Sequence, residues 1–132
     1  MSNEKRILIV DDEPDAIDIV EAMLSEINGI ITLSANDGNS GLEKAKETKP
    51  DLIILDVQMP GKSGFDVFAD LKKDESLKDT PVVMLTGIRE KTKMSFSAEN
   101  MKDFIGSEPE AYIEKPVDAV TLQNTVSRLL GV

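Results

Sequence analysis

Residues 51–61 read Asp-Leu-Ile-Ile-Leu-Asp-Val-Gln-Met-Pro-Gly, a short aliphatic run that ends in an acid and is followed closely by a turn. Four consecutive aliphatic residues between turn-forming residues are typical of a strand that is buried on both faces of a sheet. Similar runs recur, and we expect strands at 7–10, 30–34, 52–55, 82–85 and 111–113. Polar side chains follow four of these runs: Asp11 and Asp12, Asp56, Thr86, and Lys115.

Helical signals fill the segments between the runs. Apolar residues recur at helical spacing from Pro14 to Ile27, and Asn28-Gly29 predicts where this first helix stops. Capping residues predict the starts of three further helices: Asn39 or Ser40 for a helix through about Glu47, Ser63, and Asp118. We expect one more helix, with additional loop, within 87–110.

The alternation of strands and helices predicts the fold class. Strand-helix-strand repeats form parallel βαβ units with right-handed crossovers, so we expect an α/β fold with helices on both faces of a parallel sheet. In such open sheets, ligands bind outside the carboxyl ends of the strands. The polar residues that follow the strands are therefore expected to meet in one site.

Composition excludes several classes of protein. The 132 residues are 40% hydrophobic and contain no Cys and no His, which rules out disulfides, zinc sites and a resident phosphohistidine. A net charge of −10 disfavours direct binding to nucleic acid. The apolar runs are too short to insert into a membrane, and no signal-peptide pattern occurs, so we expect a cytoplasmic protein.

The expected site has the chemistry of a hard metal ion and a phosphoryl group. Carboxylates brought together repel one another, and an oxygen-only set favours Mg²⁺, with Mn²⁺ as an alternative. An aspartate beside such an ion can attack phosphorus and form an acyl phosphate. A lysine and a threonine hydroxyl would complete a cradle for the phosphoryl oxygens.

Each of these features has a simpler explanation when it is taken alone. Asp11 and Asp12 could cap the following helix, and an isolated Asp before a turn is common. A Thr at the end of a strand and a Lys before Pro are also ordinary. Their combination at one predicted sheet edge favours the functional interpretation.

These residues match a known family. The chain resembles the receiver domain of two-component response regulators, the CheY-like superfamily, over almost its whole length, and the matching segments are 7–14, 51–61, 85–87 and 112–116. The resemblance implies a flavodoxin-like, doubly wound sheet of five strands in the order 2-1-3-4-5. It also identifies residues 1–132 as a single receiver domain with no output domain.

The resemblance implies a role for each acid. Asp56 would be the phosphoacceptor. Mg²⁺ would be held directly by Asp12 and Asp56, largely through water by Asp11, and by the backbone carbonyl of Gln58.

The resemblance also implies how phosphorylation is sensed. Thr86 and Lys115 would contact the phosphoryl group. Tyr112 stands at the position of the family's switch aromatic, which turns inward as Thr86 moves; the alternative is a half-buried aromatic on an edge strand.

Three features depart from the common family pattern. Gly87 stands where Ala is usual, which keeps space but loosens the loop. Gln58 lies two residues after the acceptor, where the family tunes phosphoryl lifetime. The interval from Thr86 to Lys115 is 29 residues, longer than in most relatives, and contains the basic segment 89–93. This segment is either a solvated loop or an element that contacts a partner.

The implied function is that of a phosphorylation-dependent switch. A sensor histidine kinase or a histidine phosphotransfer protein would donate the phosphoryl group, and the last two helices with the strand between them would present a changed surface to an unknown target. Alternatives are a receiver fragment of a longer response regulator or hybrid kinase, and an aspartyl-phosphate hydrolase. The hydrolase is disfavoured because it needs a second acid at the position of Gln58.

Overall fold

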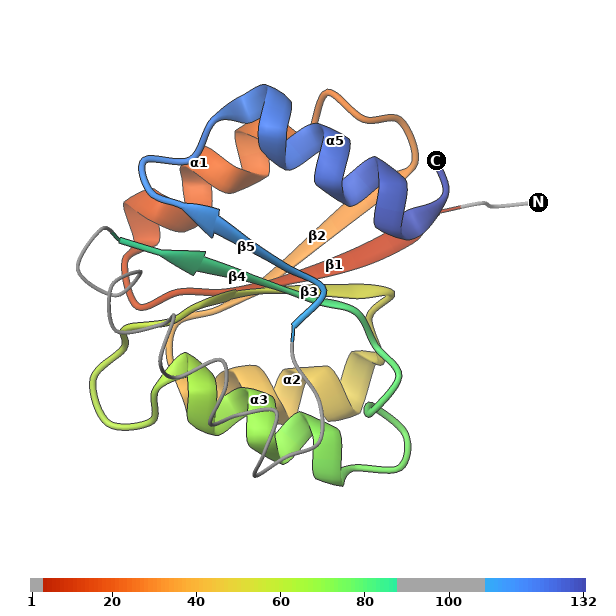
Figure 1. Ribbon diagram of the computed structural model, residues 1–132. Helices are drawn as coiled ribbons and strands as arrows, with labels where there is room; N and C mark the ends of the chain where they lie inside the picture. The colour runs from red at the N-terminus through yellow and green to blue at the C-terminus, as the bar shows by residue number, and fades with distance from the viewer. Residues whose placement is uncertain (1–3, 88–108) are drawn as a thin grey trace.

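The computed structural model describes residues 4–87 and 109–132. Their centre is a parallel sheet of five strands in the order β2-β1-β3-β4-β5 (Figure 1), which confirms the predicted fold class and strand order. The strands are β1 (Lys5–Val10), β2 (Ile30–Ala35), β3 (Leu52–Asp56), β4 (Val82–Thr86) and β5 (Ala111–Glu114).

Within 4–87 and 109–132, two pairs of helices pack on the two faces of this sheet. One face carries α1 (Pro14–Leu24) and α5 (Ala119–Leu130), and the other carries α2 (Gly38–Thr48) and α3 (Gly64–Lys73) (Figure 1). The helix expected within 87–110, and the basic segment 89–93, lie outside the described residues.

The alternation of side chains along the strands divides the core into two layers. On β1, Leu8 and Val10 join the cluster beneath α2 and α3, whereas Ile7 and Ile9 join the cluster beneath α1 and α5. Because both faces are covered, β3 and β4 are buried at every residue. This packing explains the uninterrupted aliphatic runs in the sequence.

The first helix ends earlier than its periodicity predicts. α1 begins at Pro14, as expected, but it stops at Leu24 rather than at Asn28-Gly29. Ser25 is the C-cap: its amide donates to the carbonyl oxygen of Glu21 at 2.9 Å, and its hydroxyl donates to that of Ala22 at 2.7 Å. Gly29 instead provides a positive φ of 83° in the turn that enters β2.

The predicted cap of the second helix was also wrong. The N-cap of α2 is Asp37, whose carboxylate accepts a hydrogen bond from the amide of Ser40 at 2.7 Å. The helix begins at Gly38, which packs closely against Lys62: a methyl group there would stand 2.8 Å from the carbonyl oxygen of Lys62. Neither Asn39 nor Ser40 caps the helix.

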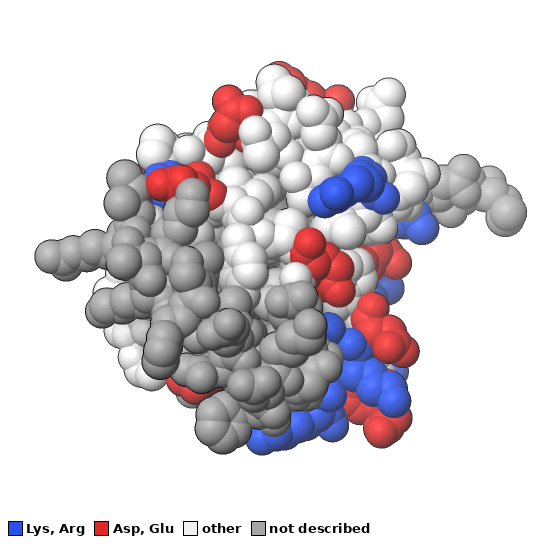
Figure 2. Space-filling model, viewed as in Figure 1, with Lys and Arg blue, Asp and Glu red and all other residues white. Residues whose placement is uncertain are grey.

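The caps of the two remaining described helices are confirmed. Ser63 caps α3 in a reciprocal capping box with Asp66, and Asp118 caps α5 by accepting from the amide of Thr121 at 2.9 Å. Figure 2 shows acidic and basic side chains lying side by side at the lower right of the view. None of the helices in the described ranges has the length and apolar character needed to span a membrane.

Candidate functional site

The carboxyl ends of the central strands bring the predicted polar residues to one edge of the sheet. β1 runs directly into Asp11, β3 ends at Asp56, and β4 ends at Thr86. These are the three polar residues, among those the structure describes, that are buried, with exposed fractions of 1%, 5% and 2%. Buried polar groups need partners, so their surroundings decide what the site can do.

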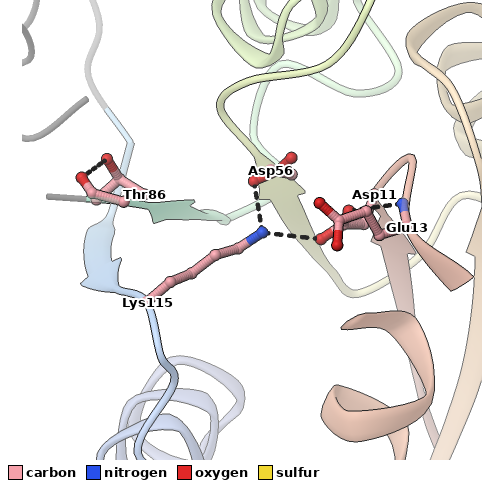
Figure 3. Close-up of polar contacts among 6 residues, drawn as sticks. Asp11, Glu13, Asp56, Thr86 and Lys115 are labelled. Atoms are coloured by element: carbon pink, nitrogen blue, oxygen red, sulfur yellow. Dashed lines mark hydrogen bonds and ion pairs between the residues drawn. The ribbon is translucent and has the colours of Figure 1, made fainter. Parts of the chain in front are cut away.

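Three carboxylates form a cluster at this edge. Asp11, Asp12 and Asp56 each offer one oxygen, and these oxygens all lie within 4.8 Å of one another. Asp11 is held in place by the amide of Glu13, which donates to its Oδ1 at 3.0 Å (Figure 3). Asp12 is half-buried and can reach solvent.

Lys115 supplies a positive charge to this cluster. It follows β5, and its ammonium nitrogen lies 2.9 Å from Oδ1 of Asp56 and 3.2 Å from Oδ2 of Asp11. Figure 3 shows the side chain reaching along the sheet edge so that its nitrogen stands between the two carboxylates. One cation therefore partly compensates two buried acids.

Burial raises the pKa of the Asp56 carboxyl to about 6. The hydrogen bond and the charge of Lys115 oppose this rise, whereas the negative charges of Asp11 and Asp12 add to it. Burial also works to lower the pKa of Lys115, but its hydrogen bond to Asp56 and the two carboxylate charges outweigh burial and raise that pKa. Lys115 therefore stays a cation over the pH range in which Asp56 titrates.

Thr86 lies at the same edge but makes a different contact. Its hydroxyl donates to the carbonyl oxygen of Gly87 at 3.1 Å (Figure 3). Its carbonyl accepts from the amide of Lys115 at 2.6 Å, which ties the ends of β4 and β5 together. A rearrangement at Thr86 would therefore reach Lys115 through the main chain.

Tyr112 and Gln58 are two further residues of the predicted site. Tyr112, on β5 beside Met84, is half-buried and packs against the core beneath α2 and α3. Gln58 is exposed, although its neighbours Val57 and Met59 are buried. Their proposed roles in switching and metal binding therefore stay predictions.

The residues at this edge fit a hard divalent cation. Three carboxylates within reach of one another provide only oxygen ligands, and the half-exposed Asp12 leaves room for water. Mg²⁺ prefers this arrangement because it takes few carboxylates and keeps much of its water shell. Among the described residues, Asp11, Asp12 and Asp56 could hold the ion; they are three of the four predicted ligands, and the backbone carbonyl of Gln58 stays a prediction.

Comparison with known proteins decides the family. Residues 7–127 match the family model described as the response regulator receiver domain. This chain is a response regulator receiver domain. The resemblance seen in the sequence is therefore confirmed, and so is membership of a family of regulatory phosphoacceptor domains that generally bind Mg²⁺.

Relatives of this receiver domain include small proteins of the same length. It is 36% identical to protein PilH of Pseudomonas aeruginosa over 127 residues, covering 96% of this chain and 98% of PilH. It is 31% identical to the polar-differentiation response regulator DivK of Brucella anthropi, covering 96% and 97%. The crystallised chemotaxis protein CheY4 of Vibrio cholerae superimposes with a TM-score of 0.79 at 29% identity, covering 96% and 98%.

One residue near the site escaped notice in the sequence. Gly64, the first residue of α3, lies against the main chain of Asp56 and Val57. The hint in the sequence was that a glycine directly follows the capping residue Ser63, although glycine has a low propensity for helix. Close approach of two backbones is a tertiary feature, so the sequence alone could not reveal it.

Proposed function

We propose that this receiver domain is a phosphorylation-dependent signalling switch in which Asp56 is the phosphoacceptor. The observation that carries the proposal is the buried Asp56 carboxylate at the end of a central strand, 2.9 Å from Lys115 and clustered with Asp11 and Asp12. A buried acid with a raised pKa, a charge partner and neighbouring acids is typical of a reactive site. It acts as a regulated acceptor and not as an enzyme.

The phosphoryl group comes from the phosphohistidine of a sensor histidine kinase or a histidine phosphotransfer protein, because this chain has no His of its own. An ionised oxygen of Asp56 attacks phosphorus and forms an acyl phosphate. The P–N bond of the donor breaks, and its electron pair returns to the imidazole nitrogen, which takes up a proton. Only the carboxylate form attacks, so ionisation of Asp56 precedes transfer.

Two side chains of this chain stabilise the product. The Lys115 ammonium already lies beside Asp56, and it forms an ion pair with the new phosphoryl oxygens after transfer. Thr86 turns its hydroxyl from the Gly87 carbonyl towards those oxygens, and the main-chain bond from Lys115 to Thr86 couples the two movements.

Asp11, Asp12 and Asp56, with the backbone carbonyl of Gln58, would hold Mg²⁺. The ion supplies neutralisation of the negative charge that gathers on the phosphoryl oxygens during transfer. Without the ion, the ammonium of Lys115 neutralises part of the negative charge of the buried carboxylates.

The output is a changed surface around β5 and α5, together with the helix expected within 87–110. Tyr112 on β5 moves inward as Thr86 moves, and the altered surface is offered to a target protein. With a net charge of −10, the target is a protein rather than a nucleic acid. We place the protein in the cytoplasm, as a single domain that can also serve in a phosphorelay.

Incubation with a small acyl phosphate, with and without Mg²⁺, tests this function. Intact-mass measurement should show one added phosphoryl group in the wild type with Mg²⁺ and none in Asp56→Asn. Asp51→Asn, at the other end of β3, is the matched control and should be labelled as wild type. Equal labelling of Asp56→Asn would contradict the assignment of the acceptor.

A further inference from the structure

The first residue of α3 lies directly beneath the candidate acceptor. Gly64 is buried, and a methyl group in place of its hydrogen would collide with the carbonyl oxygen of Asp56. The same methyl group would stand 2.9 Å from Cα of Val57. Both contacts are with main-chain atoms, which cannot turn aside as a flexible side chain can.

Gly64 also closes the loop that carries Gln58. Its amide donates to the carbonyl oxygen of Val57 at 2.9 Å, so the two ends of the segment 57–64 are joined by a hydrogen bond. This amide is one of the donors that a helix N-terminus leaves without an intrahelical partner. Within the closed loop, Val57 and Met59 are buried with exposed fractions of 5% and 6%, so the main chain on both sides of Gln58 is anchored in the core.

Further contacts hold the rest of this loop. The capping box of Ser63 and Asp66 fixes the first turn of α3, and Lys62 forms an ion pair with Asp70 one turn further along. The carbonyl of Lys62 packs on Gly38, where a methyl group would approach it to 2.8 Å. The loop thus has its own supports apart from Gly64.

We infer that Gly64 is a positioning residue: its lack of a side chain lets the start of α3 rest on the backbone of Asp56 and Val57, and this contact sets the main chain at Gln58. The inference rests on the proposed function, in which the Gln58 carbonyl and Asp56 both bind Mg²⁺. A side chain at Gly64 would push α3 and the end of β3 apart and misdirect that carbonyl.

The test measures Mg²⁺ binding to the full-length protein by calorimetry. Gly64→Ala should weaken the affinity about tenfold or more, as loss of a ligand-orienting contact does. Gly131→Ala is the control, because Gly131 ends α5 with a positive φ of 71°, where a side chain is strained but does not press on the loop 57–64. Its affinity should stay within about twofold of wild type even if its stability falls. Unchanged affinity in Gly64→Ala, or an equal loss in both variants, would overturn the inference.

A second readout separates positioning from general damage. Labelling of Asp56 by a small acyl phosphate should be slow in Gly64→Ala at limiting Mg²⁺ and recover at saturating Mg²⁺. A labelling rate that stays low at saturation would contradict a role exerted through the metal ligands.

A milder pair of variants covers the case in which Gly64→Ala does not fold. Ser63→Ala loosens the first turn of α3 without adding bulk, and Asp37→Ala removes the equivalent cap of α2. Ser63→Ala should weaken Mg²⁺ binding by about twofold to fivefold, whereas Asp37→Ala should leave it unchanged. Equal affinities in the two variants would refute the inference.

Failure of the proposed function would look different. If the wild type bound no Mg²⁺ and took up no phosphoryl group, the function would be wrong, and the main-chain contact could still be examined without metal. In that case Gly64→Ala should shift the amide resonances of Val57 and Gln58, and Gly131→Ala should not. Unshifted resonances would show that Gly64 does not set this main chain.

Discussion

The ammonium nitrogen of Lys115 lies 2.9 Å from Oδ1 of Asp56, so the acid at the end of β3 is already ion-paired before any phosphoryl group arrives. The Asp56 side chain is 7% exposed and that of Lys115 is 29% exposed. A buried carboxylate paired with a cation that still reaches solvent can exchange its partner without exposing the core.

The first prediction concerns the pH dependence of stability. The pKa of Asp56 is raised to about 6 in the folded protein, so folding favours its neutral form. Its contribution to the free energy of unfolding is complete below the unfolded pKa and is lost as the pH rises through about 6. In metal-free buffer, Asp56→Asn should therefore be more stable than wild type by about 1–3 kcal/mol at pH 8.

Chemical denaturation at several pH values would measure this difference. The advantage of Asp56→Asn should shrink from pH 8 towards pH 4. Asp51→Asn, which replaces a half-buried acid just before β3 and outside the cluster of Asp11, Asp12 and Asp56, is the control variant. A constant difference across the range would mean that the Asp56 pKa is not raised.

The second prediction concerns removal of the cation. Lys115→Met leaves the carboxylates of Asp11 and Asp56 without their shared positive charge, and should lower the free energy of unfolding by about 1–3 kcal/mol at pH 8. The loss should diminish below the Asp56 pKa, where that acid takes up a proton. Lys78→Met breaks an exposed pair with Glu75 and should change stability by less than about 0.5 kcal/mol.

Carbon NMR of the Asp56 carboxyl would give an independent check. Because the hydrogen bond and charge of Lys115 hold the pKa down, Lys115→Met should raise the Asp56 pKa further above about 6. An unchanged titration would show that the two residues do not interact in solution.

The third prediction concerns the metal ligands. Asp12→Asn removes one of three clustered carboxylates and should weaken Mg²⁺ binding at least about tenfold. Asp15→Asn changes an exposed acid in the first turn of α1 and should leave the affinity within about twofold.

Thermal unfolding with and without Mg²⁺ would report the same difference as calorimetry. Mg²⁺ at one hundred times its dissociation constant should stabilise the wild type by about 2.7 kcal/mol. Equal stabilisation of the wild type and Asp12→Asn by Mg²⁺ would show that Asp12 does not bind the ion.

The fourth prediction concerns the readout. Thr86→Ala removes the hydroxyl that donates to the Gly87 carbonyl and should cost about 1 kcal/mol of stability. Asp56 should still accept a phosphoryl group, but the ring resonances of Tyr112 should no longer respond to it. Thr86→Ser keeps the hydroxyl and should preserve the response. A full response of the Tyr112 resonances in Thr86→Ala would show that Tyr112 responds to phosphorylation independently of Thr86.

Much of the fold was predictable because its signals are local. Each aliphatic run in β1, β3 and β4 is covered on both faces, so hydrophobicity along the chain marks the strands without any knowledge of their neighbours. The caps Ser63 and Asp118 are equally local. The end of α1 and the cap of α2 were mispredicted because several neighbouring residues have suitable side chains or conformations: Ser25 rather than Asn28-Gly29 ends α1, and Asp37 rather than Asn39 or Ser40 caps α2.

Some features of the candidate site could likewise be predicted from the sequence, whereas others depend on packing. The sequence by itself determined that Asp11, Asp56 and Thr86 follow aliphatic runs, and the parallel βαβ rule then assigned them to one edge of the sheet. The tertiary structure determined that Lys115 stands between two acids, that burial raises the Asp56 pKa, and that Gly64 meets the backbone beneath it. Lys115 and Asp11 are separated by 104 residues. Distance and desolvation between such residues are products of packing, which no local pattern of residues encodes.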